Sequence, residues 1–239
     1  MKLILVFSLL YCLGTLPIFG QNQQLNVLVV TGGHDFERES FFKMFDGFEG
    51  IVYRESKHPD ADELIKSKEI DAFDVLVFYD MPKTIGDDTK KAFIKLLKKG
   101  KSMVFLHHSL ASYPDWPEYT AILGGKYFEK ATSTHGPSSY KHDVEVPVII
   151  VDKDHPITRD MNDFTIYDEV YGNYLVIPQA KPLLKTTHPE SSPVVGWTNH
   201  YKNARIVYLQ SGHDHYAYEN TNYSKLVYRS ILWVSGKLE

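Results

Sequence analysis

The stretch Leu25-Asn26-Val27-Leu28-Val29-Val30-Thr31-Gly32-Gly33 decides the fold class. Its first six residues form a short, mostly apolar run with several β-branched side chains, which is typical of a strand buried on both faces of a parallel sheet. The two glycines give room for a tight turn, but they lack the third glycine of a dinucleotide-binding fingerprint and the lysine of a P-loop. The stretch therefore predicts the first strand of an α/β sheet.

Strands and helices alternate downstream of this stretch. Further strands are expected at residues 51–53, 74–80, 103–106 and 205–209, and helices at residues 37–45, 62–66, 87–99 and 222–234. Gly100 follows the third helix directly, and glycine commonly ends helices because it adopts left-handed backbone conformations without strain. The alternation predicts a doubly wound, mostly parallel sheet, which binds its ligands at the carboxyl ends of the strands.

The middle of the chain departs from this rhythm. From Gly125 to about Ile177 the sequence contains strands and irregular segments rich in His, Pro and Tyr. With 239 residues the chain fits one globular domain, because single domains commonly reach this length. We therefore expect an irregular β-rich insertion into the α/β domain, and no second domain.

The first twenty residues have the layout of a secretory signal peptide. Lys2 precedes an apolar run over residues 3–13, and Pro17 and the small residue Gly20 follow before a polar stretch. The apolar run is shorter than the ~20 residues of a membrane-spanning helix. We expect residues 1–20 to be removed near Gly20, leaving an exported protein, periplasmic or secreted, without a membrane anchor.

Composition excludes several kinds of chemistry. Cys12, the only cysteine, lies inside the leader, so the mature protein would contain no disulfide, thiolate nucleophile or cysteine-bound zinc. The formal net charge is −4 and no block of basic residues is present, which argues against nucleic acid as a partner. Catalysis or metal binding would have to use His, carboxylates, Ser, Tyr or Lys.

Polar residues follow three of the predicted strands at the point where each strand ends. These three groups are Gly32-Gly33-His34-Asp35, His107-His108-Ser109 and Gly212-His213-Asp214-His215. The carboxyl ends of parallel strands meet at one edge of a sheet, so the groups should converge. Imidazoles and carboxylates suit acid–base chemistry or metal binding, and we regard His34, Asp35, His108, Ser109, His213 and Asp214 as candidate catalytic residues.

A carboxylate could complete this set. The segment Tyr167-Asp168-Glu169-Val170-Tyr171 carries two acidic residues, and strand alternation sends Asp168 and Glu169 to opposite faces, so only one enters the site. By the same argument only one of His107 and His108 points inward, and the sequence does not say which. A divalent metal such as zinc would be bound by the candidate ligands His34, His108, Glu169 and His213.

Aromatic side chains could stack against a sugar ring. The candidates for substrate contact are Trp116, Tyr119 and Tyr171, and Tyr127, Tyr140 and Tyr174 are further aromatics in the same part of the chain. Most aromatic residues pack in the core instead. Ser109 is a weak candidate nucleophile, because no Gly-x-Ser-x-Gly turn surrounds it.

These motifs together resemble the ThuA-like (trehalose utilisation) family over residues 25–236. The resemblance rests on the early Gly-His-Asp, on Val-Phe-Leu-His-His-Ser at residues 104–109, on Asp-His-Pro-Ile at residues 154–157, and on Gly-His-Asp at residues 212–214. It implies the class I glutamine amidotransferase-like fold, which is flavodoxin-like. In amidotransferases of that fold a cysteine occupies the place of His107-His108-Ser109, so the absent thiol argues against glutamine hydrolysis.

The resemblance implies an activity on trehalose-like disaccharides or their 3-keto derivatives. A keto group acidifies the adjacent C–H, so a histidine base could remove that proton and expel the glycosidic oxygen. A non-catalytic sugar-binding module is the alternative, with aromatics and histidines holding a saccharide. A third interpretation gives the histidines a purely structural role at the edge of the sheet.

Overall fold

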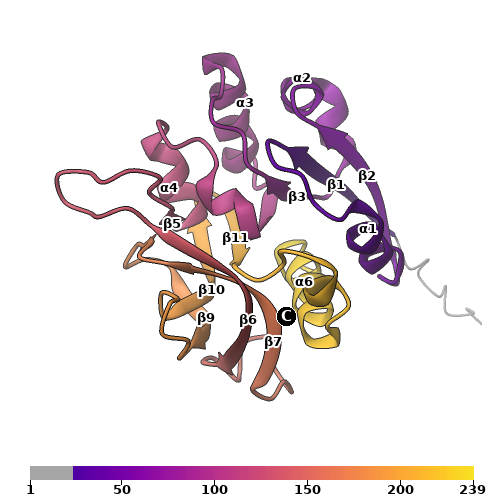
Figure 1. Cartoon of the computed structure of the whole chain (residues 1–239). Helices are drawn as coiled ribbons and strands as arrows, with labels where there is room; N and C mark the ends of the chain where they lie inside the picture. Colours follow the sequence, from indigo (N-terminus) through magenta and orange to yellow (C-terminus); the bar gives the residue numbers. More distant parts are fainter. Residues whose placement is uncertain (1–23) are drawn as a thin grey trace, which may run out of the picture.

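A nine-stranded sheet runs through the protein in the computed structural model, which describes residues 24–239 (Figure 1). Five parallel strands form one half of the sheet, and four strands that pair antiparallel form the other half. In spatial order the strands are β2 (Ile51–Lys57), β1 (Leu25–Gly32), β3 (Val75–Asp80), β4 (Ser102–Leu106), β11 (Ala204–Leu209), β10 (Val194–Tyr201), β9 (Lys181–Thr186), β6 (Ser139–Ile150) and β7 (Phe164–Gly172). The leader predicted for residues 1–20 lies outside the described residues.

Alternate side chains of the parallel strands enter two separate cores. On β1, Val27 and Val29 face one core, whereas Leu28 and Val30 face the other, and all four side chains are fully buried. Burying one such side chain contributes about 1.5–3 kcal/mol, so the apolar run at the start of β1 drives both layers together. The predicted strand is thereby confirmed as buried on both faces.

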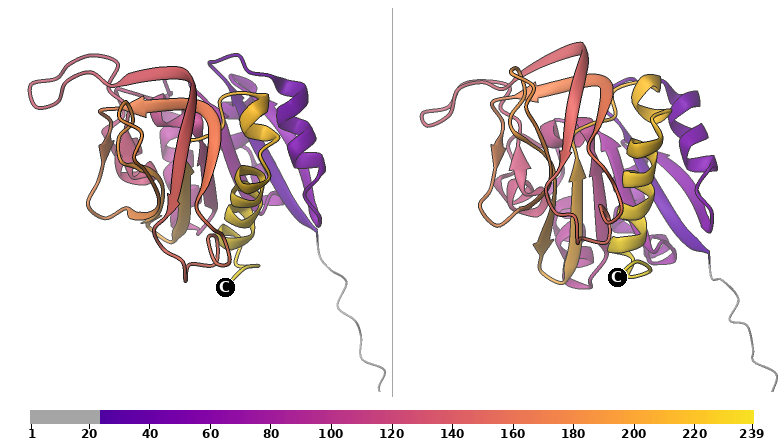
Figure 2. Two further views of the ribbon diagram at one scale, coloured as in Figure 1. Left: turned by 60° about the horizontal axis from the view of Figure 1, so that its bottom comes forward. Right: turned by 90° about the horizontal axis from the view of Figure 1, so that it is seen from below.

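Helices cover both faces of the parallel half. The first core packs under α1 (Arg38–Asp46), α5 (His215–Tyr218) and α6 (Thr221–Val234), and the second under α2 (Asp60–Lys66), α3 (Asp87–Lys98) and α4 (Pro117–Leu123). Figure 2 shows α1 and α6 on the same side of the sheet. The predicted α/β, flavodoxin-like doubly wound sheet is confirmed.

Local signals in the sequence set the ends of two helices. The carboxamide of Asn220 accepts hydrogen bonds from the backbone N–H groups of Asn222 and Tyr223 and so begins α6. Gly100 follows α3 with a φ of 89°, a left-handed conformation that favours glycine. Both helices match their predicted ranges closely.

The middle segment is more regular than the sequence suggested. The long strands β6 and β7 pair with each other, and β6 also pairs with β9, so the insertion extends the main sheet. Only a small second sheet, β5 (Gly125–Lys126) with β8 (Leu175–Val176), stands apart from it. Residues 127–138, here called the arm, connect β5 to β6 as a projecting loop without regular secondary structure (Figure 1).

The strand ends place the predicted polar groups at one edge of the sheet. Strands β1, β3, β4 and β11 are neighbours and run parallel, so the residues that follow them lie side by side. A short 3-10 helix, η2 (His107–Ala111), follows β4 directly, and η1 (Lys68–Ala72) precedes β3. Among the described helices, none is both long and apolar enough to cross a membrane.

Candidate functional site

A pocket of about 600 Å³ opens at the carboxyl edge of the sheet. It lies between the ends of β1, β4 and β11 on one side and the strands β6 and β7 with the arm on the other. The side chains and backbone that line it belong to His34, Met81, His108, Ala111, Tyr127, Glu129, Ser138, Ser139, Tyr140, His142, Glu169, Tyr171 and His213. Four of the predicted catalytic residues, His34, His108, Glu169 and His213, are therefore brought together here.

The turn after β1 carries His34 to the rim of the pocket. Gly33 adopts a φ of 81°, and a Cβ atom on it would lie 2.4 Å from the backbone carbon of Met81, so only glycine permits this close approach. The imidazole of His34 stacks on that of His108, with ring centroids 4.2 Å apart. Nδ1 of His34 is 2.6 Å from the carbonyl oxygen of Asp35 and donates to it.

The segment after β4 brings two histidines into the site. His107 has a φ of 45°, a left-handed conformation at which β4 ends and η2 begins. The alternation of side chains along a strand therefore does not determine where the two rings point. Both rings are buried: His107 lies behind the pocket, and His108, which is 3% exposed, lines it. Of the pair, only His108 lines the pocket, as expected, whereas His107 belongs to the polar cluster behind it.

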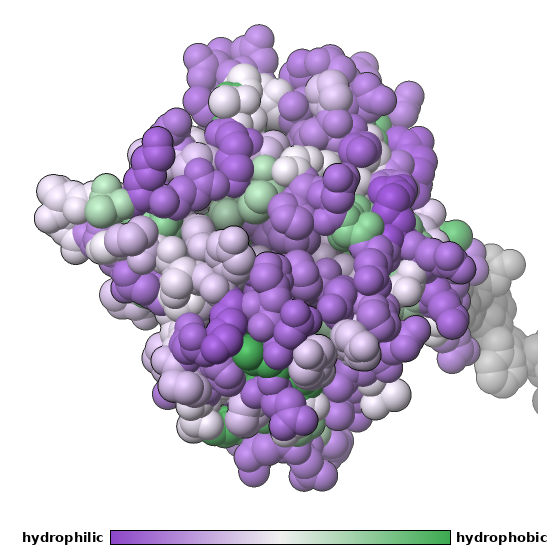
Figure 3. Space-filling view, in the orientation of Figure 1, coloured by the Kyte–Doolittle hydropathy of each residue, from purple (hydrophilic) through white to green (hydrophobic). Residues whose placement is uncertain are grey.

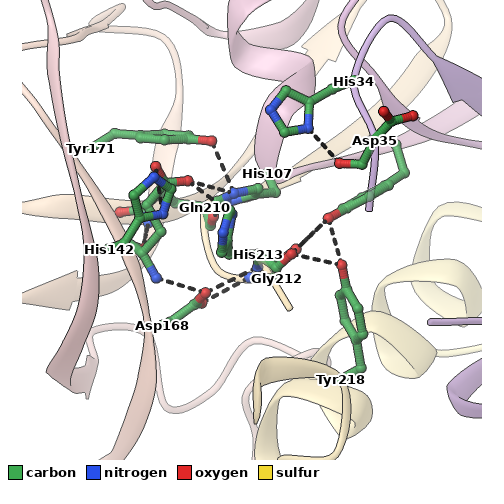
Figure 4. Close-up of polar contacts among 12 residues, drawn as sticks. His34, Asp35, His107, His142, Asp168, Tyr171, Gln210, Gly212, His213 and Tyr218 are labelled. Carbon is green, nitrogen blue, oxygen red and sulfur yellow. Dashed lines mark hydrogen bonds and ion pairs between the residues drawn. The ribbon is translucent and has the colours of Figure 1, made fainter. Parts of the chain in front are cut away.

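Glu169 on β7 is the centre of the cluster. Its Oε2 lies 2.9 Å from Nε2 of His107 and 3.3 Å from Nδ1 of His213, and its Oε1 lies 3.4 Å from Nδ1 of His142. Figure 4 labels these three histidines. Nδ1 of His107 donates to the carbonyl oxygen of Gln210 at 2.6 Å. The Tyr171 hydroxyl lies 3.0 Å from Nε2 of the same ring, so His107 is held on both sides.

Asp168 supports the loop that carries His213. Its carboxylate accepts hydrogen bonds from the backbone N–H groups of Gly212 at 2.8 Å and His213 at 3.0 Å. Gly212 has a φ of 121°, and a Cβ there would lie 2.2 Å from the hydroxyl oxygen of Tyr223, so the tight approach requires glycine. As alternation predicts, Glu169 faces the pocket whereas Asp168 does not line it.

The cluster shifts the pKa values of its members in opposite directions. Burial opposes ionisation of Glu169, but the adjacent His107 and His213 outweigh it and hold the pKa of this carboxyl well below its usual range. The same carboxylate raises the pKa of His213. Burial, together with the neighbouring His107 and His34, holds the pKa of His108 well below 6.5, so its ring is neutral at physiological pH.

The ring of His108 carries an unused nitrogen. Nε2 of His108 and Nδ1 of His213 are buried, and neither has a hydrogen-bond partner among residues 24–239. Buried polar atoms are normally paired, and an exception calls for an explanation. Both rings line the pocket, so these atoms are placed to meet a ligand there.

Three predicted catalytic residues do not line the pocket. The Ser109 hydroxyl donates to the carbonyl oxygen of Phe78 at 2.9 Å and lies 3.1 Å from Oδ1 of Asp80, and Ser109 does not line the pocket. Asp214 is the N-cap of α5 and accepts from Tyr216. Asp35 is exposed and does not line the pocket.

Of the three aromatics predicted to contact substrate, only Tyr171 lines the pocket. Trp116 and Tyr119 are buried in the second core, where α4 packs against the sheet, and the Tyr119 hydroxyl donates to the carbonyl oxygen of Ser109 at 2.8 Å. Their spacing reflects the apolar face of α4. Tyr127 and Tyr140 line the pocket instead, and Tyr140 is 62% exposed.

Sequence analysis missed His142 as a site residue and left the role of His107 open. His142 lies on β6, and a strand pairing across more than twenty residues brings it opposite Glu169. No local motif marks it. Two groups of side chains have atoms close enough to share a metal ion, namely His107 with His108 and His213, and His142 with Glu169 and His213; neither includes His34.

The face of the molecule seen in Figure 3 is mainly hydrophilic, with small and separate apolar areas. The histidine-lined pocket lies at the strand ends of a doubly wound sheet, which is where folds of this kind bind their ligands. The fold and the site thus define a flavodoxin-like α/β protein with a histidine–carboxylate cluster at its strand ends.

The family profile described as trehalose utilisation (ThuA) matches residues 26–234, so the chain belongs to the ThuA family. This confirms the resemblance seen in the sequence. No curated protein matches the chain at a significant level.

Solved structures agree with this assignment of fold. A ThuA-like protein from Parabacteroides merdae superposes with a TM-score of 0.79 at 18% identity, covering 90% of this chain and 91% of that one. A ThuA-like protein from Bacteroides uniformis gives 0.70 at 17% identity, covering 92% and 95%. PurLQS from Thermotoga maritima gives 0.57 at 15% identity, covering 87% and 98%. At these identities the likeness establishes the fold alone.

Proposed function

We propose that this protein is an enzyme that cleaves glycosidic bonds in oxidised disaccharides, of which 3-keto-trehalose is the representative substrate. The observation that carries the proposal is the His108 imidazole. Its Nε2 is buried, lacks a hydrogen-bond partner among the described residues, and belongs to a ring that lines the pocket. A neutral, desolvated imidazole is a suitable general base.

The proposed reaction is an elimination. His108 takes the proton from the carbon between the ketone and the anomeric carbon, and the electron pair forms a double bond as the bond from the anomeric carbon to the glycosidic oxygen breaks. The departing oxygen takes a proton from His34 at the rim or from water. The products are a free sugar and an unsaturated keto sugar, to which water can add in a second step.

The rest of the pocket suits a sugar ring. Tyr127, Tyr140 and Tyr171 offer aromatic faces on which a sugar ring could stack. Ser138 and Ser139 offer hydroxyls that could bind its polar groups. The volume of about 600 Å³ is ample for a disaccharide-sized ligand. Family membership in trehalose utilisation supports a glucose disaccharide as the parent compound.

The test is incubation of purified protein with 3-keto-trehalose and, as a matched control, with trehalose itself, following the release of free sugar. We expect release from the keto sugar alone, because only it carries an acidified C–H. The His108→Ala variant should lose turnover, whereas His215→Ala, whose ring pairs with Glu37 outside the pocket, should retain it.

Binding of both sugars without turnover would refute the enzyme and favour a sugar-binding module.

We also propose that the protein is exported, because residues 1–20 have the layout of a leader. N-terminal sequencing of the protein recovered from its native cell envelope or medium tests this. An intact Met1 there would contradict it.

A further inference from the structure

We propose that His142, Glu169 and His213 bind a divalent metal ion of the zinc type at the wall of the pocket. The ion deepens the proposed function, since it would lie where a substrate carbonyl can reach it. The set differs from the one expected from the sequence, because His142 takes part and neither His34 nor His108 does.

Each histidine of the set already lies near one oxygen of Glu169 at the spacing of two ligands of one ion, His142 near Oε1 and His213 near Oε2. Nδ1 of His142 lies 3.4 Å from Oε1 of Glu169, and Nδ1 of His213 lies 3.3 Å from Oε2. Ligands placed tetrahedrally around zinc at about 2.0–2.2 Å are themselves roughly 3.3 Å apart. The donors of all three residues lie within 4.8 Å of one another.

One of the two pocket nitrogens that make no hydrogen bond within the described residues belongs to this set. Nδ1 of His213 is buried and makes no hydrogen bond within residues 24–239, although Glu169 is near. An ion between the two would satisfy both the imidazole lone pair and the carboxylate. Two imidazoles with one carboxylate suit zinc better than magnesium or calcium, which prefer oxygen ligands alone.

A break in strand pairing brings His142 to the site. Lys141 pairs with Val170 and Val144 pairs with Asp168, so His142 and Asp143 together oppose the single residue Glu169. This is a β-bulge, and bulges often re-aim side chains beside functional sites. Asp143 has a φ of 60°, which is an uncommon backbone conformation for a residue other than glycine. The regular strand pairing on either side of the bulge would not produce this conformation, so it belongs to the bulge itself.

Neighbouring groups hold two of the ligands in place. Nε2 of His107 lies 2.9 Å from the Glu169 carboxylate on the side away from the pocket, and Asp168 accepts from the backbone N–H of His213. Support of this kind orients metal ligands and strengthens their binding.

The second group of close donors, His107 with His108 and His213, is the competing location. His107 is fully buried, does not line the pocket, and already contacts Gln210, Tyr171 and Glu169. All three residues of the proposed set line the pocket, so an ion held by them can meet both solvent and substrate.

The experiment measures metal binding without any substrate. Chelator-treated full-length protein is titrated with Zn²⁺ in a calorimeter, and Co²⁺ is added separately to record its visible absorption. We expect one Zn²⁺ per chain, and a loss of more than about 100-fold in affinity in His142→Ala and in His213→Ala. The His142 side chain is 44% exposed, so its removal should leave the fold intact, which circular dichroism checks.

Two control variants locate the ion. His215→Ala and His108→Ala should each keep the wild-type Zn²⁺ affinity within about threefold, because neither residue is a proposed ligand. Absence of stoichiometric Zn²⁺ binding, or loss of binding in His108→Ala with none in His142→Ala, would overturn the proposal. Keto-sugar turnover is scored separately, so metal binding without turnover refutes only the proposed function, and turnover without metal binding refutes only the ion.

Discussion

Two histidine–carboxylate clusters lie at the same edge of the sheet. Both contain buried atoms without a hydrogen-bond partner, Oδ1 of Asp62 in one and two imidazole nitrogens in the other, but only the second cluster lines the pocket. In the closed cluster, at the ends of β2 and β3, His58 lies between Asp80, 2.9 Å from Nε2, and Asp62, 3.3 Å from Nδ1. Ser109 and Ser112 also approach Asp80, at 3.1 and 3.5 Å from Oδ1. Neither His58 nor Asp80 lines the pocket.

The open cluster consists of His107, His108, His142, Glu169 and His213. Its carboxylate contacts three rings, yet two of its buried nitrogen atoms have no hydrogen-bond partner among the described residues and their rings line the pocket. The comparison teaches that burial and charge pairing do not by themselves mark a functional site. The distinguishing feature is unpaired donor atoms that face a cavity.

The largest expected effect concerns catalysis at the open cluster. Replacing His108 by Ala should lower kcat on 3-keto-trehalose by about 10²–10⁴-fold, the usual contribution of a general base. Steady-state kinetics well below the melting temperature of the variant measure this. A kcat within about threefold of wild type would show that the unpaired nitrogen is not a base.

At the closed cluster the expected effect is on stability. Asp80→Ala leaves His58 charged and buried without its closer partner, and removing one member of a buried pair costs about 3–5 kcal/mol. Urea unfolding measures this, with Asp88→Ala as the control, since Asp88 is highly exposed and its pairing with Lys91 is screened by solvent. Similar losses in both variants would contradict the comparison.

The closed cluster should also make stability depend on pH. Burial lowers the pKa of His58, but Asp62 and Asp80 outweigh it and raise the pKa to about 9. A raised pKa in the folded state stabilises fully below the unfolded value of about 6.5, and the benefit is lost as pH rises through about 9. We expect a decrease on the order of 2 kcal/mol in the free energy of unfolding between pH 6 and pH 9.5.

The control is the same titration in His58→Gln, whose curve should lack this alkaline decrease. His108 should make stability depend on pH in the opposite direction. Its pKa is lowered in the folded protein, so the unfolded chain takes up the proton first as pH falls below about 6.5, and acid then destabilises the fold. His108→Gln should therefore lose part of the acid sensitivity of the wild type. Identical alkaline curves for wild type and His58→Gln would show that the closed cluster does not hold a charged histidine.

Sequence patterns predicted the parallel half of the fold and most strand-end histidines, for one physical reason. Apolar runs such as Val27–Val30 identify buried strands locally, and parallel strands bring their ends together without further information. The pairing of β6 with β7 depends on contacts distant in sequence, so His142 could not be placed. His107 escaped a clear prediction because a left-handed backbone conformation replaces strand alternation at that residue.

The same limit applies to the closed cluster and to the aromatics. His58 comes directly after β2, which the structure extends to Lys57 beyond the predicted strand. It meets Asp80 at the end of β3 because β2 and β3 flank β1 on its two sides, and the sequence does not give this strand order. Trp116 and Tyr119 could not be distinguished from pocket residues by residue type, because stacking on a sugar and packing in a core select the same side chains.

The smallest expected effect compares the aromatic neighbours of the two clusters. Tyr113, beside His58, is 2% exposed, whereas Tyr140, beside His142 and on the pocket lining, is 62% exposed. An exposed ring with little packing contributes little to stability, but a sugar stacked on it would gain about 0.5–1.5 kcal/mol. Tyr140→Ala should therefore raise KM by about 3–10-fold, leave kcat unchanged, and shift the melting temperature little.

Tyr216→Ala is the matched control, since Tyr216 is 53% exposed and does not line the pocket. It should leave KM at the wild-type value, because its ring contacts Tyr167 and His215 and not the pocket. If Tyr140→Ala lowered kcat instead of raising KM, the ring would act on the geometry of His142, its neighbour at 5.2 Å, and stacking on the substrate would not be its role. An unchanged KM would remove Tyr140 from the substrate site and leave Tyr127 and Tyr171 as its aromatic walls.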